Sequence, residues 1–180
     1  MTDRRRWIAA GRPRIQDRSA SQQPMAPIGR YSLGDEQLTT AQMLAYDPSP
    51  EELFDRLRSR VGDRGQSPDG EVFTEIADAL REAPQPPALR ATLYRALALV
   101  PGVQFLGHVR DRLGRAAIGV AFTERTGVRH ELLFDPDTAE VLAERQVVTR
   151  RVGELTVPPG TISEDIVYTR RAVTDATVRP

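Results

Sequence analysis

The chain has 180 residues and a mass of 20.0 kDa, a length typical of one domain with room for irregular ends. Hydrophobic residues make up 39% of it and charged residues 28%, so we expect a packed core with part of the chain left uncovered. No apolar run approaches the roughly 18 residues that a membrane-spanning helix needs, so the sequence predicts no membrane span.

Three residue types are absent, and each absence excludes a kind of chemistry. Without Cys the chain has no disulfide, thiol nucleophile or thiolate metal site. Without Lys, all 25 basic residues are Arg, which excludes Schiff-base and Walker-type lysine chemistry. Without Asn it has no N-glycosylation site. Since Lys and Asn share A-rich codons, their joint absence is best explained by a GC-rich genome.

Charge is balanced overall but unevenly distributed. Residues 1–30 carry a net charge of +5, residues 31–87 of −7 and residues 88–180 of +2. The basic and acidic segments could be two halves of one contact, or the basic segment could be a solvated tail. Three Arg residues near the start resemble an export signal, but only the four apolar residues Trp7 to Ala10 follow them. A signal peptide needs about 7–15 apolar residues, so none is predicted.

Residues 1–36 are expected to form a flexible, Arg-rich arm, because Pro and Gly recur through them. Residues 37–180 are expected to form a single α+β domain, helical over 37–100 and an antiparallel sheet over 103–178. Apolar residues recur at helical spacing, and Ser49, Pro50 and Glu52 form a helix-start signature. Helices are predicted at Thr40 to Tyr46, Pro50 to Val61, Pro68 to Pro84 and Pro87 to Val100.

After Pro101-Gly102 the apolar residues alternate, which is typical of strands. Turns about ten residues apart predict an antiparallel meander of about five strands, with the helices packed on one of its faces. The strands are expected at Val103 to Val109, Ala116 to Phe122, Val128 to Phe134, Val141 to Thr149 and Ile162 to Val173.

The two histidines are the first candidates for a base or a metal ligand. His130 shares the parity of Leu132 and Phe134, so it is expected to face the helices. His108 has the opposite parity to Phe105, so it is expected to face the other way. Opposite faces and a separation of about 10 Å would prevent the histidines from sharing one metal ion.

Paired carboxylates occur at three places, Glu51-Glu52, Asp135/Asp137 and Glu164-Asp165. The first pair fits helix capping and the second fits a hairpin turn, so neither predicts acid–base catalysis. There is no nucleophile elbow, phosphate loop or calcium loop. The sequence therefore predicts no catalytic, cofactor-binding or metal-binding residue, and no cofactor. A sequence pI near 6.8 does not favour a nucleic-acid binder.

The segment from Pro87 to Arg145 carries a set of motifs that occur together in a known family. They are Pro87-Ala88-Leu89-Arg90-Ala91-x-Leu93-Tyr94-Arg95-Ala96-Leu97-Ala98, Val100-Pro101-Gly102-Val103, Asp111-Arg112-x-Gly114-Arg115, Glu131-Leu132-Leu133-Phe134-Asp135-Pro136-x-Thr138 and Val141-Leu142-Ala143-Glu144-Arg145. The segment resembles the C-terminal part of an actinobacterial family of uncharacterised, membrane-anchored extracytoplasmic proteins, often encoded near sigma factors. The resemblance implies an extracytoplasmic domain and brings no catalytic signature.

Two departures from the family pattern have consequences. The family tends to have Gly after the Thr of the Asp-Pro-x-Thr turn, where this chain has Ala139. An Ala forced to positive φ costs about 1 kcal/mol, so the turn is expected to differ. The family's membrane helix and early strands are also missing from this sequence. Missing strands would leave an exposed sheet edge, which predicts self-association into a homo-oligomer.

These observations lead to two main functional hypotheses. The first is a non-catalytic cell-envelope-type module that binds a protein partner, or an apolar ligand in a groove between a curved sheet and helices on its concave face. The second is a soluble regulatory partner of a sigma factor or other transcription protein, with residues 31–87 as the contact. A third reading, a hydrolase that uses His130 and a nearby carboxylate, has the least support.

Overall fold

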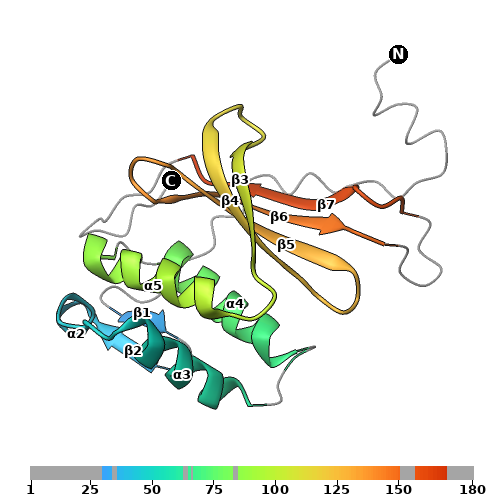
Figure 1. Cartoon of the computed structure of the whole chain (residues 1–180). Helices are drawn as coiled ribbons and strands as arrows, with labels where there is room; N and C mark the ends of the chain where they lie inside the picture. The colour runs from blue at the N-terminus through green and yellow to red at the C-terminus, as the bar shows by residue number, and fades with distance from the viewer. Residues whose placement is uncertain are drawn as a thin grey trace.

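The computed structural model of the chain describes residues 30–33, 36–62, 65, 67–82, 85–150 and 157–169 (Figure 1). The helices come first and the main sheet follows, which confirms the predicted α+β class. In chain order the elements are β1 (Arg30–Leu33), β2 (Glu36–Thr39), α2 (Thr40–Leu44), α3 (Pro50–Val61), α4 (Pro68–Glu82), α5 (Pro87–Leu99), β3 (Gln104–Arg110), β4 (Ala116–Thr123), β5 (Val128–Phe134), β6 (Val141–Val148) and β7 (Ile162–Val167).

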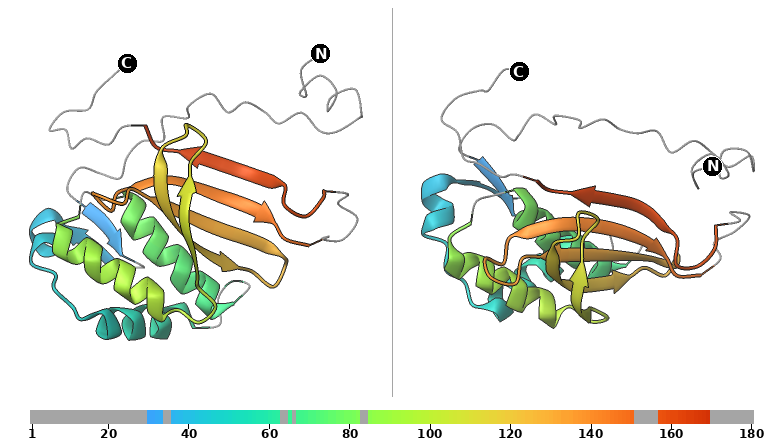
Figure 2. Two further views of the ribbon diagram at one scale, coloured as in Figure 1. Left: turned by 45° about the horizontal axis from the view of Figure 1, so that its top comes forward. Right: turned by 90° about the horizontal axis from the view of Figure 1, so that it is seen from above.

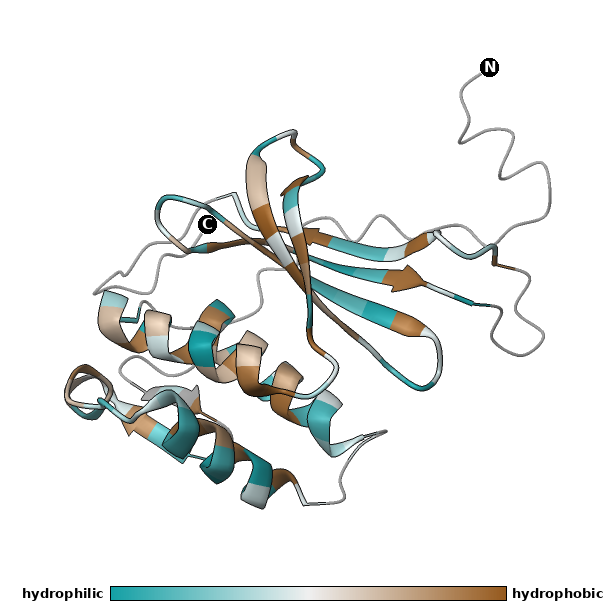
Figure 3. Cartoon of the chain, viewed as in Figure 1, coloured by the Kyte–Doolittle hydropathy of each residue, from teal (hydrophilic) through white to brown (hydrophobic). Residues whose placement is uncertain are grey.

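Strands β3 to β7 form one five-stranded antiparallel sheet in sequence order, so the predicted meander is confirmed. Strands β5, β6 and β7 each have three polar residues in the middle and apolar residues near both ends, in place of a strict polar–apolar alternation (Figure 3). Strands β1 and β2 form a separate hairpin.

The described elements lie in three layers. Helices α4 and α5 lie against the sheet, and α3 and the β1–β2 hairpin cover them from the other side (Figures 1 and 2). Aromatic rings join the sheet to the helices. The rings of Phe73 on α4 and Phe122 on β4 are 5.8 Å apart, and those of Tyr94 on α5 and Phe134 on β5 are 4.5 Å apart. Leu132, 1% exposed, completes a filled interior between these layers.

Helix α3 shows why the helices form where the sequence predicts them. Ser49 and Glu52 make the reciprocal bonds of a capping box, with Ser49 N to Glu52 Oε2 at 2.9 Å and Glu52 N to Ser49 Oγ at 3.2 Å. Leu53 and Leu57 are buried one turn apart, and each such side chain contributes roughly 1.5–3 kcal/mol by leaving water.

The sheet bends toward the face without helices, which we call the helix-free face. On that face Val109 of β3 packs against a small apolar cluster formed by Ala117, Leu133 and Ala143 of β4, β5 and β6. The carbonyl of Arg110 at the end of β3 accepts a hydrogen bond from Arg145 of β6. The β3–β4 hairpin therefore crosses over the helix-free face. The concave side is opposite to the one expected, and the helix side is filled by side chains instead of forming an apolar groove.

Part of the predicted arm is structured. Residues 30–33 and 36 were expected to be irregular and residues 37–39 to be helical, but they belong to strands β1 and β2 of the hairpin. A two-stranded hairpin is marginal alone, and this one is held by apolar side chains such as Leu33, which joins the core next to α4. Such packing between residues distant in the chain cannot be predicted from the local sequence. Residues 1–29, and residues 170–173 of the predicted last strand, lie outside the described residues.

The turn between β5 and β6 contains a strained residue. Ala139 has φ of 56°, and it is the one residue other than Gly with positive φ in the described part of the chain. Its N–H donates to the carbonyl of Asp135 at 2.8 Å, and its carbonyl accepts from the Tyr94 hydroxyl at 3.0 Å. These backbone bonds hold the left-handed conformation that an Ala side chain disfavours.

We predict that Ala139→Gly stabilises the protein. Gly adopts this φ without the Cβ penalty and keeps both backbone hydrogen bonds, so the free energy of unfolding should rise by about 0.5–1 kcal/mol. Urea unfolding of the two proteins measures the difference. Ala139→Val should lower stability, and a destabilised Gly variant would contradict the assignment of strain.

Candidate functional site

The two histidines lie on the same face of the sheet, which corrects the expectation of opposite faces. His130 pairs with Phe122 and His108 pairs with Ile118, and both partners point to the helix side of β4. A bulge between Phe105 and Gly107 shifts the parity of β3, which a simple alternation rule cannot anticipate.

The histidines are nevertheless far apart. Two strand spacings and four residues along β4 place their positions roughly 16 Å from each other, far beyond the ~2 Å bonds of a shared metal ion. Among the described residues, no group of three or more His, Asp or Glu side chains is arranged to hold a metal ion.

The three carboxylate pairs have different surroundings. Glu52 completes the cap of α3, as expected. Asp135 Oδ1 accepts the N–H groups of Asp137 at 2.8 Å and Thr138 at 2.9 Å, and these hydrogen bonds hold the pKa of Asp135 below its usual range. Glu164 and Asp165 lie in strand β7 and point to opposite faces.

A carboxylate that was not singled out from the sequence lies near His130. Glu124 follows β4, and its side chain lies at the start of α4, where a Cβ on Gly70 would overlap Oε1 of Glu124 and lie 2.9 Å from Ser67 Oγ. Burial raises the pKa of Glu124, partly offset by His130 and Ser67. Oε2 of Glu124 is buried without a hydrogen bond.

These groups are not arranged as a catalytic triad. In a triad the histidine bonds to both the nucleophile and the acid, whereas here Ser67 bonds to the carboxylate of Glu124 and not to His130. The Ser67 hydroxyl accepts the N–H of Gly70 at 3.0 Å, which is the role of a helix cap. Glu124 therefore ties the β4–β5 turn to α4.

The Asp111-Arg112-x-Gly114-Arg115 motif forms the best-connected polar cluster of the sheet. The Asp111 side chain is fully buried, and it accepts from the N–H groups of Leu113 and Arg115, each at 2.9 Å, and from Arg115 Nε at 2.5 Å. The other two nitrogens of Arg115 donate to the carbonyls of Tyr168 and Leu142, both at 3.0 Å. One guanidinium therefore joins the β3–β4 turn to the ends of β6 and β7.

The α5 motif holds the neighbouring β5–β6 turn. Arg90 donates to the carbonyl of Thr138 at 2.6 Å, and Tyr94 donates to that of Ala139 while its ring packs on Phe134. The motifs of α5, of the β3–β4 turn and of the β5–β6 turn thus meet at one end of the sheet, whereas Val100 to Val103 precede β3 at its other end. Because their polar atoms bond to one another and to backbone, their arrangement is structural.

An ion network lies on the helix-free face. Arg129 donates to Glu131 at 2.5 Å, and Glu131, 7% exposed, also lies 3.9 Å from Arg145. Arg145 Nε is 3.8 Å from Asp165 Oδ1, and both atoms are buried without a hydrogen bond. Arg112, from the β3–β4 turn, reaches Asp165 at 3.9 Å. The network links β5, β6, β7 and the curled hairpin.

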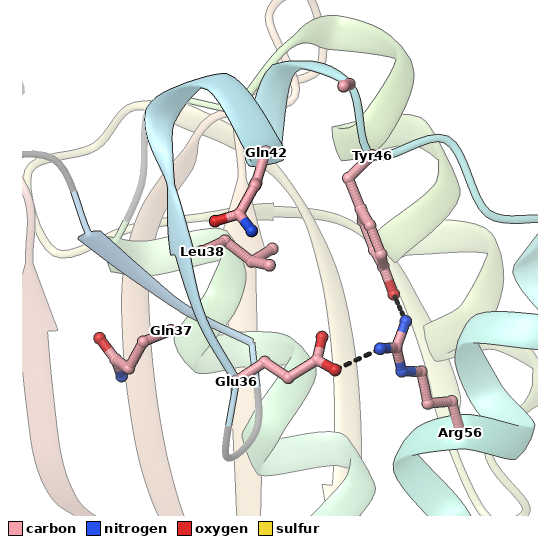
Figure 4. Close-up of a pocket in the computed structure, with 7 residues that line it drawn as sticks. Glu36, Gln37, Leu38, Gln42, Tyr46 and Arg56 are labelled. Carbon is pink, nitrogen blue, oxygen red and sulfur yellow. Dashed lines mark hydrogen bonds and ion pairs between the residues drawn. The ribbon is translucent and has the colours of Figure 1, made fainter.

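A pocket of about 500 Å³ lies between β2, α2 and α3 (Figure 4). Arg56 lies at its edge, 5.6 Å from the centre of the Tyr46 ring, and donates to the Tyr46 hydroxyl at 2.8 Å and to Glu36. Burial alone would raise the pKa of Glu36, but hydrogen bonds from Arg60 and Arg56 lower it. The charges pair with one another, so the pocket presents no group poised for a reaction. The lining residues are Glu36, Gln37, Leu38, Gln42, Ala45, Tyr46 and Arg56.

Comparison of the chain with protein-family models, with curated proteins and with solved structures gives no match. The family resemblance of residues 87–145 therefore stays a prediction. Within the described residues, no helix combines the length and apolar character needed to cross a bilayer.

We predict that Asp111→Ala destabilises the fold by about 3 kcal/mol, because it leaves the largely buried Arg115 without its carboxylate. Burial alone would raise the pKa of Asp111, but its bonds to Arg115 outweigh burial and lower it. A lowered pKa means that this stability is present above the ordinary value of 3.8 and is lost as the pH falls below it. Urea unfolding between pH 7 and pH 3 should show this loss in the parent chain and not in Asp111→Ala.

We predict that Glu124→Gln, unlike Asp111→Ala, increases the stability of the fold at pH 7. The raised pKa means that folding favours the protonated acid, so Glu124 contributes more stability as the pH falls through its raised pKa toward the ordinary value of 4.5. The neutral amide should therefore raise the Tm at pH 7 and remove this part of the pH dependence. A lower Tm at pH 7 would contradict this sign, because it would show that the carboxylate of Glu124 stabilises the fold despite its burial.

Proposed function

We propose that this chain is a non-catalytic, cell-envelope-type binding module whose β3–β4 hairpin contacts a protein partner. The observation that carries the proposal is the exposure of large apolar side chains on this hairpin. Phe105 on the edge strand β3 is 71% exposed, and Leu113 at the turn is 57% exposed. Phe105 lies near the start of β3 and Leu113 at the turn beyond its other end, so Phe105 is the anchor of the proposed contact, since exposed aromatic residues are typical anchors of protein interfaces.

A protein partner fits the structure better than an apolar ligand. The space between the helices and the sheet, where such a ligand would have been expected, is occupied by Phe73, Phe122 and Leu132. The pocket between β2, α2 and α3 lies elsewhere and is lined largely by polar and paired charged groups. The exposed apolar surface of the hairpin needs no cavity.

The envelope assignment rests on the resemblance of residues 87–145. Its support is that most of the quoted motifs are connected at one end of the sheet, where Arg115 bonds to Leu142 and Tyr94 bonds to the β5–β6 turn. A fold shared with the family would require such connections between the motifs. The non-catalytic assignment is supported by the structural roles of Ser67, which caps α4, and of Glu124, which contacts Ser67.

The second candidate, a soluble partner of a transcription protein, is favoured by the position of α3. This helix belongs to the layer farthest from the sheet and exposes Glu51 and Asp55. Co-purification with a transcription protein at low salt, lost at high salt, would favour it, since exposed charges are screened.

We predict that Phe105→Ser changes stability by less than about 0.5 kcal/mol, because the side chain is exposed. Partner binding should fall roughly 10-fold or more, as for a buried aromatic anchor. A photo-crosslinking residue at position 105 should capture a protein from the envelope fraction of the native cells. The matched control is position 44 on α2, where Leu44 is 64% exposed. Equal capture from both positions, or capture from the cytosolic fraction alone, would contradict the proposal.

A further inference from the structure

The two outer strands of the sheet differ in their ability to accept another strand. β3 is interrupted by the bulge between Phe105 and Gly107, and its Arg110 carbonyl is already occupied by Arg145. Bulges of this kind protect sheet edges. β7 pairs regularly with β6 from Glu164 to Val167, and within the described residues β6 is its one neighbouring strand.

The hydrogen-bond pattern shows which backbone groups of β7 face outward. Tyr168 N donates to the carbonyl of Leu142 at 2.9 Å, which makes Tyr168, Ile166 and Glu164 the residues whose backbone groups point toward β6. The N–H and C=O groups of Asp165 and Val167 therefore point away from the sheet. These four groups form a template for one more strand.

The sequence of β7 has few of the features that block such pairing along the stretch from Glu164 to Val167. Ile-Ser-Glu-Asp-Ile-Val has no Pro and no basic residue, and its register shift lies at its start, next to Ile162. Ile162 and Ile166 are 45% and 40% exposed, which is high for isoleucine in a strand. The edge is therefore suited to a partner, provided that the charges match.

The charges of β7 decide which partner fits. A second copy of β7 in antiparallel pairing would bring Glu164 and Asp165 opposite the same carboxylates, and like charges directly opposite destabilise a strand pair. On the helix-free face, Asp165 already lies near Arg145 and Arg112. On the other face, Glu164 is exposed and bonds to the neutral amide of Gln146 at 2.6 Å, so its charge is not compensated by these contacts.

We propose that β7 is a second interaction surface that takes an extended, basic protein segment by strand addition. A basic side chain lies opposite Glu164 and an apolar side chain two residues away lies opposite Ile166, since both of these residues are on the same face. The proposal is independent of the β3–β4 hairpin and of Phe105, so an experiment can contradict one proposal without affecting the other.

The probe is a blocked peptide, acetyl-Thr-Arg-Thr-Ile-Thr-Arg-Thr-amide, added to the full chain while backbone amide exchange is followed by NMR. The amides of Asp165 and Val167 should become protected, and those of β3 should not. Glu164→Gln should weaken peptide binding about 3-fold and Glu164→Lys roughly 10-fold, from the size of cross-strand charge pairs. Asp55→Lys on α3 is the matched control and should leave binding unchanged.

The same peptide with Glu in place of Arg should bind at least about 10-fold more weakly. Equal binding of the two peptides, protection of β3 in place of β7, no binding of the basic peptide, or unchanged binding by Glu164→Lys would each overturn the proposal. A concentration-dependent dimer of the full chain that protects Asp165 and Val167 would also overturn it, because it would show that a second copy occupies the edge.

Discussion

The Arg115 guanidinium is the interaction on which the curvature of the sheet depends. The fully buried carboxylate of Asp111, four residues earlier, fixes the position of Arg115. These contacts within the β3–β4 turn close the turn without the help of another strand. Its remaining donors bond to the carbonyls of Leu142 and Tyr168, which lie at the ends of β6 and β7. A buried ion pair is stable when its remaining hydrogen-bonding groups are satisfied, and these carbonyls satisfy them.

The curled hairpin and the filled interior follow from this arrangement. With the turn fixed near β6 and β7, Val109 packs against the cluster that contains Leu133. The small residues of β4 let β3 approach closely, because a Cβ at Gly119 would lie 3.1 Å from the Cβ of Leu106. On the helix side, the aromatic rings of Phe73 and Tyr94 pack against the sheet. Apolar surface that is not used in either core remains at the sheet edges.

The family motifs and the two proposed binding surfaces therefore use different residues of this molecule. The residues that produce the family resemblance, such as Tyr94, Asp111 and Arg115, bond to one another or to backbone and build the framework. The residues that we propose as partner contacts, Phe105 on β3 and Glu164 on β7, lie on edge strands at positions that the framework does not use. Binding surfaces on a rigid sheet can change without loss of the fold, whereas a change in the framework affects stability first.

The sequence by itself determined the α+β class, the helix starts and the meander, because capping residues, 3.6-residue spacing and period-2 alternation are local signals. Ser49 with Glu52 and the Ala116 to Phe122 alternation needed no tertiary information. The tertiary structure alone decided the face of His108, through a bulge, and the proximity of Glu124 to His130 at the start of α4. It alone decided the β1–β2 hairpin, through packing next to α4, and the direction of curvature, through the reach of Arg115. Each of these features depends on contacts between residues distant in sequence, and local periodicity cannot predict such contacts.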